Sequence, residues 1–367
     1  PDFEALERDL RIFDIAHDIA PQIRFGPGTA PGTAAVTVTA TEPKRFEWTL
    51  SLDNFGREET GLYRASVFGR WSSVSGWRDT LSVQAQVAEA AYSVSLGYSR
   101  PVGPRGGRVI ATVSGANSQI IQGPFSPVDV ISDTMSASLG YRIPFRVRPD
   151  RHWIFEGGLA FDKTNSQIED LPFSDITVRE IYLSASHARQ TGKALLGYSM
   201  GLKIGRADAK QTSETEGNYR LLFGSVTYSR PLGKRLMFEA DVQGQYAQGE
   251  NLPVARLFSV GGPTSVRGYP NSVRTGDSGV VARLQLSAAE ALRPFANKDI
   301  GLKPFGFFDA AVVVPYRVEG GINSEQDILA SIGAGLRVDF REKASGLLMV
   351  AVPLRNTLGF TDKGSAT

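Results

Sequence analysis

The sequence predicts an all-β fold, a transmembrane antiparallel β-barrel of about fifteen strands. Three observations lead to this fold class. About fifteen segments alternate apolar and polar side chains with a period of two, which is the pattern of β-strands. Short and long connections alternate between these segments, as they do in known transmembrane barrels. No stretch approaches the roughly 18 to 20 apolar residues of a membrane-spanning helix.

Composition limits the possible classes further. The chain has 367 residues, with 39 glycines, three histidines, no cysteine and a formal net charge of +2. This length corresponds to two soluble domains or to one large barrel. A charge so close to neutral gives no sign of a nucleic-acid partner. The lack of cysteine excludes a disulfide framework and a thiolate metal site, and it is compatible with an oxidising envelope compartment.

The first 45 residues have a different pattern. Five apolar residues fall on one helical face: Phe3, Leu6, Leu10, Phe13 and Ala16. A strand near Gln22 to Phe25, a turn at Pro27 to Gly32 and a strand at Ala35 to Thr39 follow. So short a segment buries only a small core, and we expect residues 1–45 to be the end of a soluble domain. The start lacks the basic and apolar regions of a signal peptide, so we expect a longer precursor.

The alternation is clearest in Leu236 to Tyr246, where Leu236, Phe238 and Val242 face one way and Glu239 and Asp241 the other. The predicted strands, in order, are Phe46 to Asp53, Leu62 to Trp71, Leu81 to Val87, Tyr92 to Tyr98, Arg108 to Ser114, Met135 to Tyr141, Trp153 to Phe161, Glu180 to Ser186, Ala194 to Ile204, Leu221 to Tyr228, Leu236 to Tyr246, Val280 to Ala288, Phe305 to Val314, Ile328 to Phe340 and Leu347 to Val352. A soluble β-sandwich of this size would have to divide into domains, and no linker is visible. The sequence therefore favours a single barrel that comprises residues 46–367.

The connections indicate how the barrel is oriented. Short turns are predicted at Arg100 to Gly106, Ala188 to Lys193 and Arg230 to Lys234, and long loops at Asn117 to Asp133, Lys163 to Ile176, Arg206 to Tyr219 and Glu250 to Ser278. Outer-membrane barrels have short periplasmic turns and longer outward loops. The short turns, and the N-terminal region with them, are therefore expected in the periplasm.

One long connection carries the first functional candidate. Phe258 to Tyr269 is non-periodic and places Arg267 among small residues and glycines. In a barrel, such a segment could fold back into the pore, and Gly261 and Gly262 would allow tight turns or a close approach to the wall. The alternative is a solvated arginine on an extracellular loop.

Catalysis finds little support in the sequence. His17, His152 and His187 lie far apart, without the spacing of a helical metal site. The residues Gly197 to Gly201 match Gly-x-Ser-x-Gly, but they lie within the predicted strand Ala194 to Ile204 and not at the strand-to-helix turn that a catalytic serine of this type needs. We therefore predict a protein that is not an enzyme and that needs no cofactor or metal.

These residues also resemble a known family. Pro27 to Thr33, followed by Ser51 to Gly56 and Thr60 to Arg64, resembles the junction between the last polypeptide-transport-associated (POTRA) domain and the barrel of two-partner secretion transporters, the hemolysin secretion/activation type. Val266, Arg267, Gly268 and Tyr269 are similar to the loop-six signature of the wider superfamily of translocases that join POTRA domains to a barrel. Phe307 and Asp309 resemble its Phe-x-Asp motif on strand thirteen.

The resemblance implies a barrel of sixteen strands whose loop six, residues 250–279 here, enters the lumen. It implies that Arg267 pairs with Asp309, and strand parity agrees. Phe307 and Asp309 share one face, opposite Phe308 and Val312, which suit lipid. A dehydrated lumen would favour a bidentate arginine for the carboxylate. Tyr269 would stack or hydrogen-bond at this contact, whereas the alternative for Asp309 is a pore-wall charge without a partner.

The resemblance also implies a function. We expect a bacterial outer-membrane transporter that moves a large exoprotein, such as an adhesin or hemolysin, from the periplasm to the cell surface. Its partners would be that exoprotein and outer-membrane lipid, with no nucleic acid, and the barrel would be monomeric. An outer-membrane protein insertase of the same superfamily and a passive porin are the alternatives.

The end of the chain departs from the family. Asn356 to Thr367 is loop-like, without a final alternating strand. We therefore expect the last strand to be missing. An open barrel would leave unpaired backbone groups on its two edge strands that lipid cannot satisfy, so we expect this incomplete chain not to form a stable closed pore alone.

Overall fold

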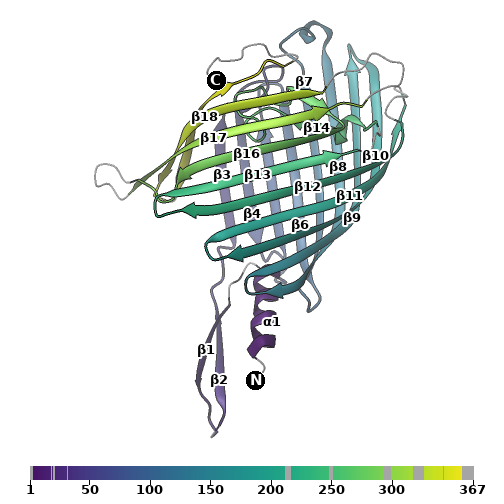
Figure 1. The fold of residues 1–367 in the computed structure, drawn as a ribbon. Coiled ribbons are helices and arrows are strands. Elements are labelled where there is room, and N and C mark those ends of the chain that lie inside the picture. The colour runs from purple at the N-terminus through teal and green to yellow at the C-terminus, as the bar shows by residue number, and fades with distance from the viewer. Residues whose placement is uncertain are drawn as a thin grey trace.

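The computed structural model describes residues 3–17, 19, 21–30, 32–210, 216–247, 251–292, 299–316, 326–341 and 343–357. Within them, one antiparallel sheet of fifteen strands forms most of the molecule (Figure 1). Its strands are β3 (Phe46–Asp53), β4 (Arg64–Ser72), β5 (Thr80–Val87), β6 (Ala91–Val102), β7 (Gly107–Gln119), β8 (Val130–Arg148), β9 (Arg151–Ile168), β10 (Leu171–Thr191), β11 (Ala194–Ala209), β12 (Gly217–Leu232), β13 (Leu236–Tyr246), β16 (Ser278–Ala288), β17 (Ile300–Val314), β18 (Asp327–Phe340) and β19 (Ala344–Pro353). Each predicted strand corresponds to one of these, so the predicted fold class is confirmed.

The N-terminal elements lie at the end of the sheet that carries the short turns (Figure 1). Helix α1 (Phe3–Ala16) is followed by an antiparallel hairpin of β1 (Pro21–Pro27) and β2 (Ala34–Ala40). The helix rests against β8, and the Arg108 guanidinium donates to the Ala16 carbonyl oxygen at 2.5 Å. The predicted helix and both strands are therefore present, whereas the assignment of residues 1–45 to a POTRA domain stays a prediction. No helix among the described residues is long and apolar enough to cross a membrane.

Each strand of the sheet has an outer and an inner face. On β10, Ile181 and Leu183 are exposed, and their cross-strand neighbour Leu159 on β9 is exposed beside them. Glu180, on the opposite face of β10, is buried and contacts a segment inside the curve of the sheet. Exposed apolar side chains on one face and polar ones on the other are expected where lipid covers the outside and water fills the lumen.

The outer face can be tested at the middle of β10. We expect Ile181→Arg to destabilise the folded barrel by about 2 to 4 kcal/mol in lipid, because the charge would lie near mid-bilayer. Ser184→Arg places the same side chain on the lumen face and should have a much smaller effect. Urea unfolding of both variants in lipid vesicles measures the difference, and equal destabilisation would contradict this assignment of faces.

The structure corrects one of the predicted long loops. Lys163 to Ile176 is extended hairpin, since β9 runs to Ile168 and β10 begins at Leu171. Its turn residues, Glu169 and Asp170, have φ of 50° and 62°. Polar side chains face one another across these strands, as Ser166 on β9 does opposite Ser174 on β10. The apolar face is missing because strands this long extend past the roughly nine to eleven residues that cross a bilayer. Without that face the period-two signal disappears.

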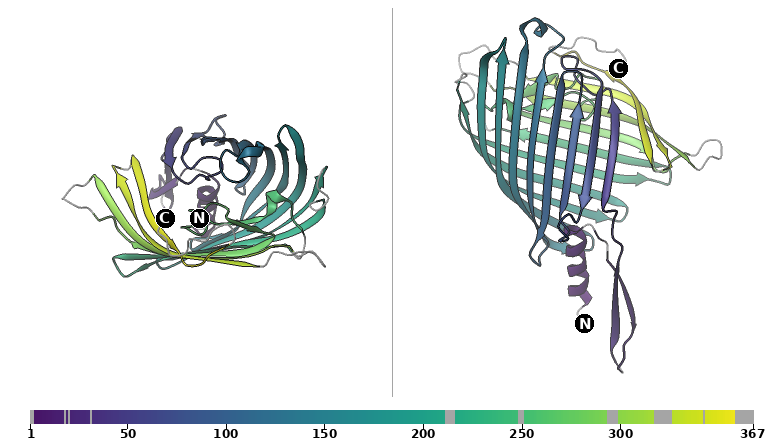
Figure 2. Two further views of the ribbon diagram at one scale, coloured as in Figure 1. Left: turned by 90° about the horizontal axis from the view of Figure 1, so that it is seen from above. Right: turned by 180° about the vertical axis from the view of Figure 1, so that it is seen from behind.

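The sheet is strongly curved and has two edges, formed by β19 and β3 (Figure 2). Trp48 and Leu52 on β3 are exposed, as is Leu348 on β19. Among the pairings of the described residues, no ladder joins β3 to β19. Most of the predicted loop-like end, residues 358–367, lies outside the described part of the chain.

Candidate functional site

The candidate site is the connection between β13 and β16. We call residues 251–279 loop six; residue 250, included in the predicted range, lies outside the described residues. The loop contains a short 3-10 turn, η3 (Val254–Arg256), and a small hairpin of β14 (Phe258–Val260) and β15 (Arg274–Gly276). The hairpin packs against the inner side of β16 and β17 (Figure 1). The loop therefore runs within the curve of the sheet.

The structure brings Arg267 and Asp309 together. The Arg267 Nε atom donates to Asp309 Oδ2 and its Nη2 atom to Oδ1, each at 2.7 Å. The Arg267 backbone N–H also donates to Oδ2, at 3.1 Å. Arg267 is 4% exposed and Asp309 is fully buried. A bidentate pair with an added backbone bond satisfies both carboxylate oxygens, which a buried charge requires.

The neighbours of Arg267 complete its environment. Its Nη1 atom donates to Gln285 Oε1 at 2.9 Å, and its guanidinium carbon lies 3.6 Å from the centre of the Phe307 ring. A guanidinium over an aromatic face is stabilised by the ring electrons, most strongly where water is excluded. Both predicted strand-thirteen residues, Phe307 and Asp309, thus contact the loop arginine.

Val266 and Tyr269, the other large side chains of the loop-six motif, lie in an apolar cluster. The buried residues of this cluster are Val260, Val266, Tyr269, Val281, Ala311, Val313 and Leu329. They come from the loop and from β16, β17 and β18. Apolar burial on this side and an ion pair on the other hold the tip of the loop against the wall.

The tip also reaches both edges of the sheet. The Tyr269 hydroxyl lies 2.7 Å from the carbonyl oxygen of Arg355, just after β19, and 2.9 Å from that of Ala330 on β18. The Asn271 amide donates to the carbonyl oxygens of Phe55 and Gly56, in the connection after β3. Loop six therefore touches the chain beside each of the two edge strands.

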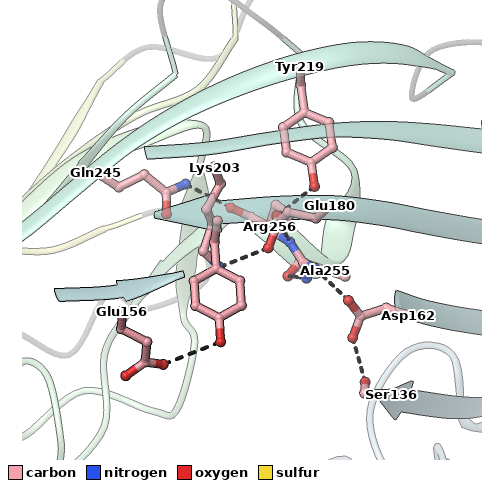
Figure 3. A network of polar contacts seen from close by, with 10 residues as sticks. Ser136, Glu156, Asp162, Glu180, Lys203, Tyr219, Gln245, Ala255 and Arg256 are labelled. Carbon is pink, nitrogen blue, oxygen red and sulfur yellow. Dashed lines mark hydrogen bonds and ion pairs between the residues drawn. The ribbon is translucent and has the colours of Figure 1, made fainter. Parts of the chain in front are cut away.

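A second anchor was not found from the sequence. Arg256, at the other end of the loop, donates from Nε to Glu180 Oε2 at 2.7 Å and from Nη2 to Asp162 Oδ2 at 2.5 Å (Figure 3). The Tyr219 hydroxyl donates to the same Glu180 oxygen at 2.7 Å. Lys203 Nζ lies 3.4 Å from the other Glu180 oxygen. These partners come from β9, β10, β11 and β12, whereas Asp309 lies on β17.

The charge balance of this second cluster explains its burial. The Arg256 side chain is 10% exposed and the Glu180 side chain 1% exposed. Burial lowers the pKa of Arg256, but the Glu180 and Asp162 carboxylates raise it by more, so the net pKa lies above its ordinary value. Arg256 therefore stays charged, and the ion pairs persist at any pH at which the carboxylates are ionised.

The predicted glycines fit the tight path of the tip. Gly261, Gly262 and Gly268 have φ of 107°, 88° and 89°, in the region that favours glycine. A Cβ atom on Gly261 would lie 2.3 Å from the Pro270 carbonyl oxygen, which is backbone and cannot move aside.

We therefore expect Gly261→Ala to destabilise docking of the loop by about 1 to 3 kcal/mol, through backbone strain. Gly346→Ala is the matched control, because a Cβ there meets no atom within 4 Å. Limited proteolysis of the two variants in detergent compares their loops. Equal protection of loop six in the two variants would show that the close approach at Gly261 is not needed.

The remaining polar residues of the lumen wall form a looser set. Arg283 donates to the Thr264 carbonyl oxygen at 3.2 Å, and Gln285 donates to Glu239 at 3.1 Å. Asp241 accepts from Gln243 at 2.9 Å. In the described part of the chain, no group of three His, Asp or Glu side chains could hold a metal ion.

Comparison with known proteins finds consistent relatives. Residues 32–338 match the family model described as haemolysin secretion/activation protein ShlB/FhaC/HecB. The heme/hemopexin transporter protein HuxB of Haemophilus influenzae is 23% identical over 98% of this chain and 66% of its own. The outer membrane transporter CdiB of Dickeya dadantii is 24% identical over 72% of this chain and 50% of its own.

Among solved structures, CdiB from Escherichia coli superposes with a TM-score of 0.83 at 18% identity, covering 97% of this chain and 68% of that one. This likeness shows the same fold. The chain thus spans about two thirds of one curated relative and half of the other.

Proposed function

Because the chain belongs to the haemolysin secretion/activation family, we propose that it translocates a large secreted exoprotein across the outer membrane, from the periplasm to the cell surface. The protein is an outer-membrane β-barrel, and the relatives named above are transporters. Three further statements belong to the proposal. This chain has its own exoprotein, the exoprotein passes unfolded through the lumen, and a single barrel is the transport unit.

The observation that carries the proposal is loop six inside the barrel. Arg267 attaches its tip to β17, and Arg256 attaches its beginning to β9 and β10. The contacts that must break for the loop to leave the wall are these two ion-pair clusters and the small apolar cluster around Val266. Displacement of such a loop would widen the path for a polypeptide, whereas its return would restrict the pore.

The lumen wall suits an extended, weakly bound substrate. The inward side chains of β13 and β16 around the loop include Glu239, Asp241, Arg283 and Gln285, a mixture of both charges and an amide. Mixed charges offer many small hydrogen-bonding contacts and no single strong site. A chain that must move through the lumen needs contacts weak enough to release it, as the conduction of ions through channels also requires.

The direct experiment follows the exoprotein. The full-length transporter is expressed together with a large secreted protein encoded beside it, and the exoprotein is quantified in the medium and in the periplasm. We expect most of it in the medium with the transporter and in the periplasm without it.

The two alternatives give other results. An insertase would, on depletion, lower the amounts of many unrelated outer-membrane proteins. A porin would change the uptake of small solutes and leave the exoprotein where it was. Either pattern, with exoprotein secretion unaffected, would contradict the proposal.

A further inference from the structure

A row of three arginines lies across neighbouring strands near the short-turn end of the barrel. Arg148 at the end of β8 faces Arg151 at the start of β9, and Arg151 faces Arg189 near the end of β10. None of the three forms an ion pair with the described residues. Like charges directly opposite one another destabilise a sheet, so an anion bound between them would stabilise this row.

A row of aromatic rings lies immediately beside the arginines on the same strands. Phe145 faces Trp153, Trp153 faces His187, and His187 faces Tyr198. The Trp153 and His187 rings are 4.6 Å apart, and those of His187 and Tyr198 are 4.9 Å apart. Rows of such rings are typical of the level at which a barrel meets lipid headgroups.

Both rows are on the outer face. Trp153 has the same parity on β9 as the exposed Leu159, and His187 the same parity on β10 as the exposed Ile181 and Leu183. Moving from mid-membrane toward the short turns, the surface is therefore first aliphatic, then aromatic, then cationic. This order follows the layers of a bilayer leaflet from acyl chain to headgroup.

A cavity of about 400 Å³ opens between the two rows. It is lined by Arg146, Val147, Arg148, Arg151, Trp153 and His187. His187 is 9% exposed, and its Nδ1 atom has no hydrogen-bond partner among the described residues. A buried nitrogen without a partner is costly unless a ligand or water satisfies it. Asp150, in the same turn, is the nearby acidic side chain, so the cations outnumber it.

We propose that this cavity binds the phosphate headgroup of an anionic phospholipid from the periplasmic leaflet of the outer membrane. Arg148 and Arg151 contact the phosphate oxygens, Arg146 adds charge from above the Phe145 ring, 5.3 Å away, and His187 Nδ1 bonds the headgroup. The acyl chains lie over the exposed Phe155 and Leu159. Arginine suits this role because its planar fork matches phosphate oxygens.

The test measures lipid retained by the full-length protein. The protein is purified in a nonionic detergent and titrated with phosphatidylglycerol or phosphatidylcholine, and bound lipid is counted by native mass spectrometry. We expect one phosphatidylglycerol to be held at concentrations at which phosphatidylcholine is not. Each basic residue near an anionic lipid contributes roughly a fivefold factor, so Arg148→Gln/Arg151→Gln should weaken retention about 25-fold.

Two controls make the result specific. Arg230→Gln/Lys234→Gln removes the same charge at the turn between β12 and β13 and should retain the lipid like the parent. His187→Phe keeps an aromatic ring beside Trp153 and should weaken retention about tenfold, as the loss of a charge-assisted hydrogen bond does. Thermal unfolding without lipid should leave the arginine variant at least as stable as the parent, since it relieves like-charge contact.

Three outcomes would overturn the proposal. They are equal retention of both lipids, full retention by Arg148→Gln/Arg151→Gln, and displacement of phosphatidylglycerol by millimolar inorganic phosphate, which would indicate a site for free phosphate.

Discussion

Asp309→Ala is expected to stop most secretion while the barrel still folds. The substitution removes three hydrogen bonds at once and leaves the Arg267 guanidinium buried without its anion. Loss of one partner of a buried ion pair costs about 3 to 5 kcal/mol. A cost at the low end of this range shifts the balance between docked and released loop by roughly 100-fold.

Several comparisons separate the loop contact from general damage. Asp241→Asn alters another lumen carboxylate, which is not bonded to Arg267, and this variant should secrete the exoprotein normally. Arg267→Ala should impair secretion as well, and the double variant with Asp309→Ala should lose little more than either single one, because residues that form one pair are not additive. Exoprotein in the medium measures function, and resistance to urea measures folding. Normal secretion by both single variants would refute the proposed role of the pair.

Arg256→Met is expected to have the second largest effect. It keeps the length of the side chain but leaves Glu180 and Asp162 side by side without their shared cation. Lys203 remains at 3.4 Å from Glu180, so the loss should be somewhat smaller than at Asp309. We expect destabilisation of the barrel by about 2 to 4 kcal/mol, measured by urea unfolding, and faster proteolysis of loop six.

The reason for this loss can be isolated. Arg256→Met with Glu180→Gln should recover much of the stability, since a neutral amide can still accept the Tyr219 hydrogen bond. Arg179→Gln, one residue away on the exposed face of β10, breaks only a surface pair with Asp208 and should change stability little. If Arg179→Gln and Arg256→Met behave alike, the cluster around Arg256 contributes no more than an exposed salt bridge.

The strands were predictable wherever lipid covers one face, because burial in lipid enforces strict alternation. Val280 to Ala288 and Phe305 to Val314 are examples, and the structure has β16 and β17 there. The prediction of a loop at Lys163 to Ile176 was wrong for the same reason, since that hairpin has no lipid to face and pairs polar residues such as Ser166 and Ser174 across its strands.

The candidate site was predictable only in part. Arg267 and Asp309 each lie in a sequence motif, and the alternation of side chains along the strand indicated that Asp309 faces inward. Arg256 and Glu180 have no such signal, because Arg256 precedes the motif in an irregular segment and Glu180 looks like any polar lumen residue. Their contact depends on how a loop crosses four strands of a curved sheet, which local pattern cannot specify. The inward face of Glu180 and the loop position of Arg256 were the available hints.

The contacts of the loop-six tip have a consequence for how the barrel assembles. Asn271 bonds to carbonyl oxygens more than 200 positions earlier in the chain, and Tyr269 to one 86 positions later. Closing such long loops carries an entropy cost that neighbouring strand pairs do not bear. The strands can therefore associate one after another before the tip finds both edges. On this view the tip docks late in folding, and its docking marks a sheet that has reached its full curvature.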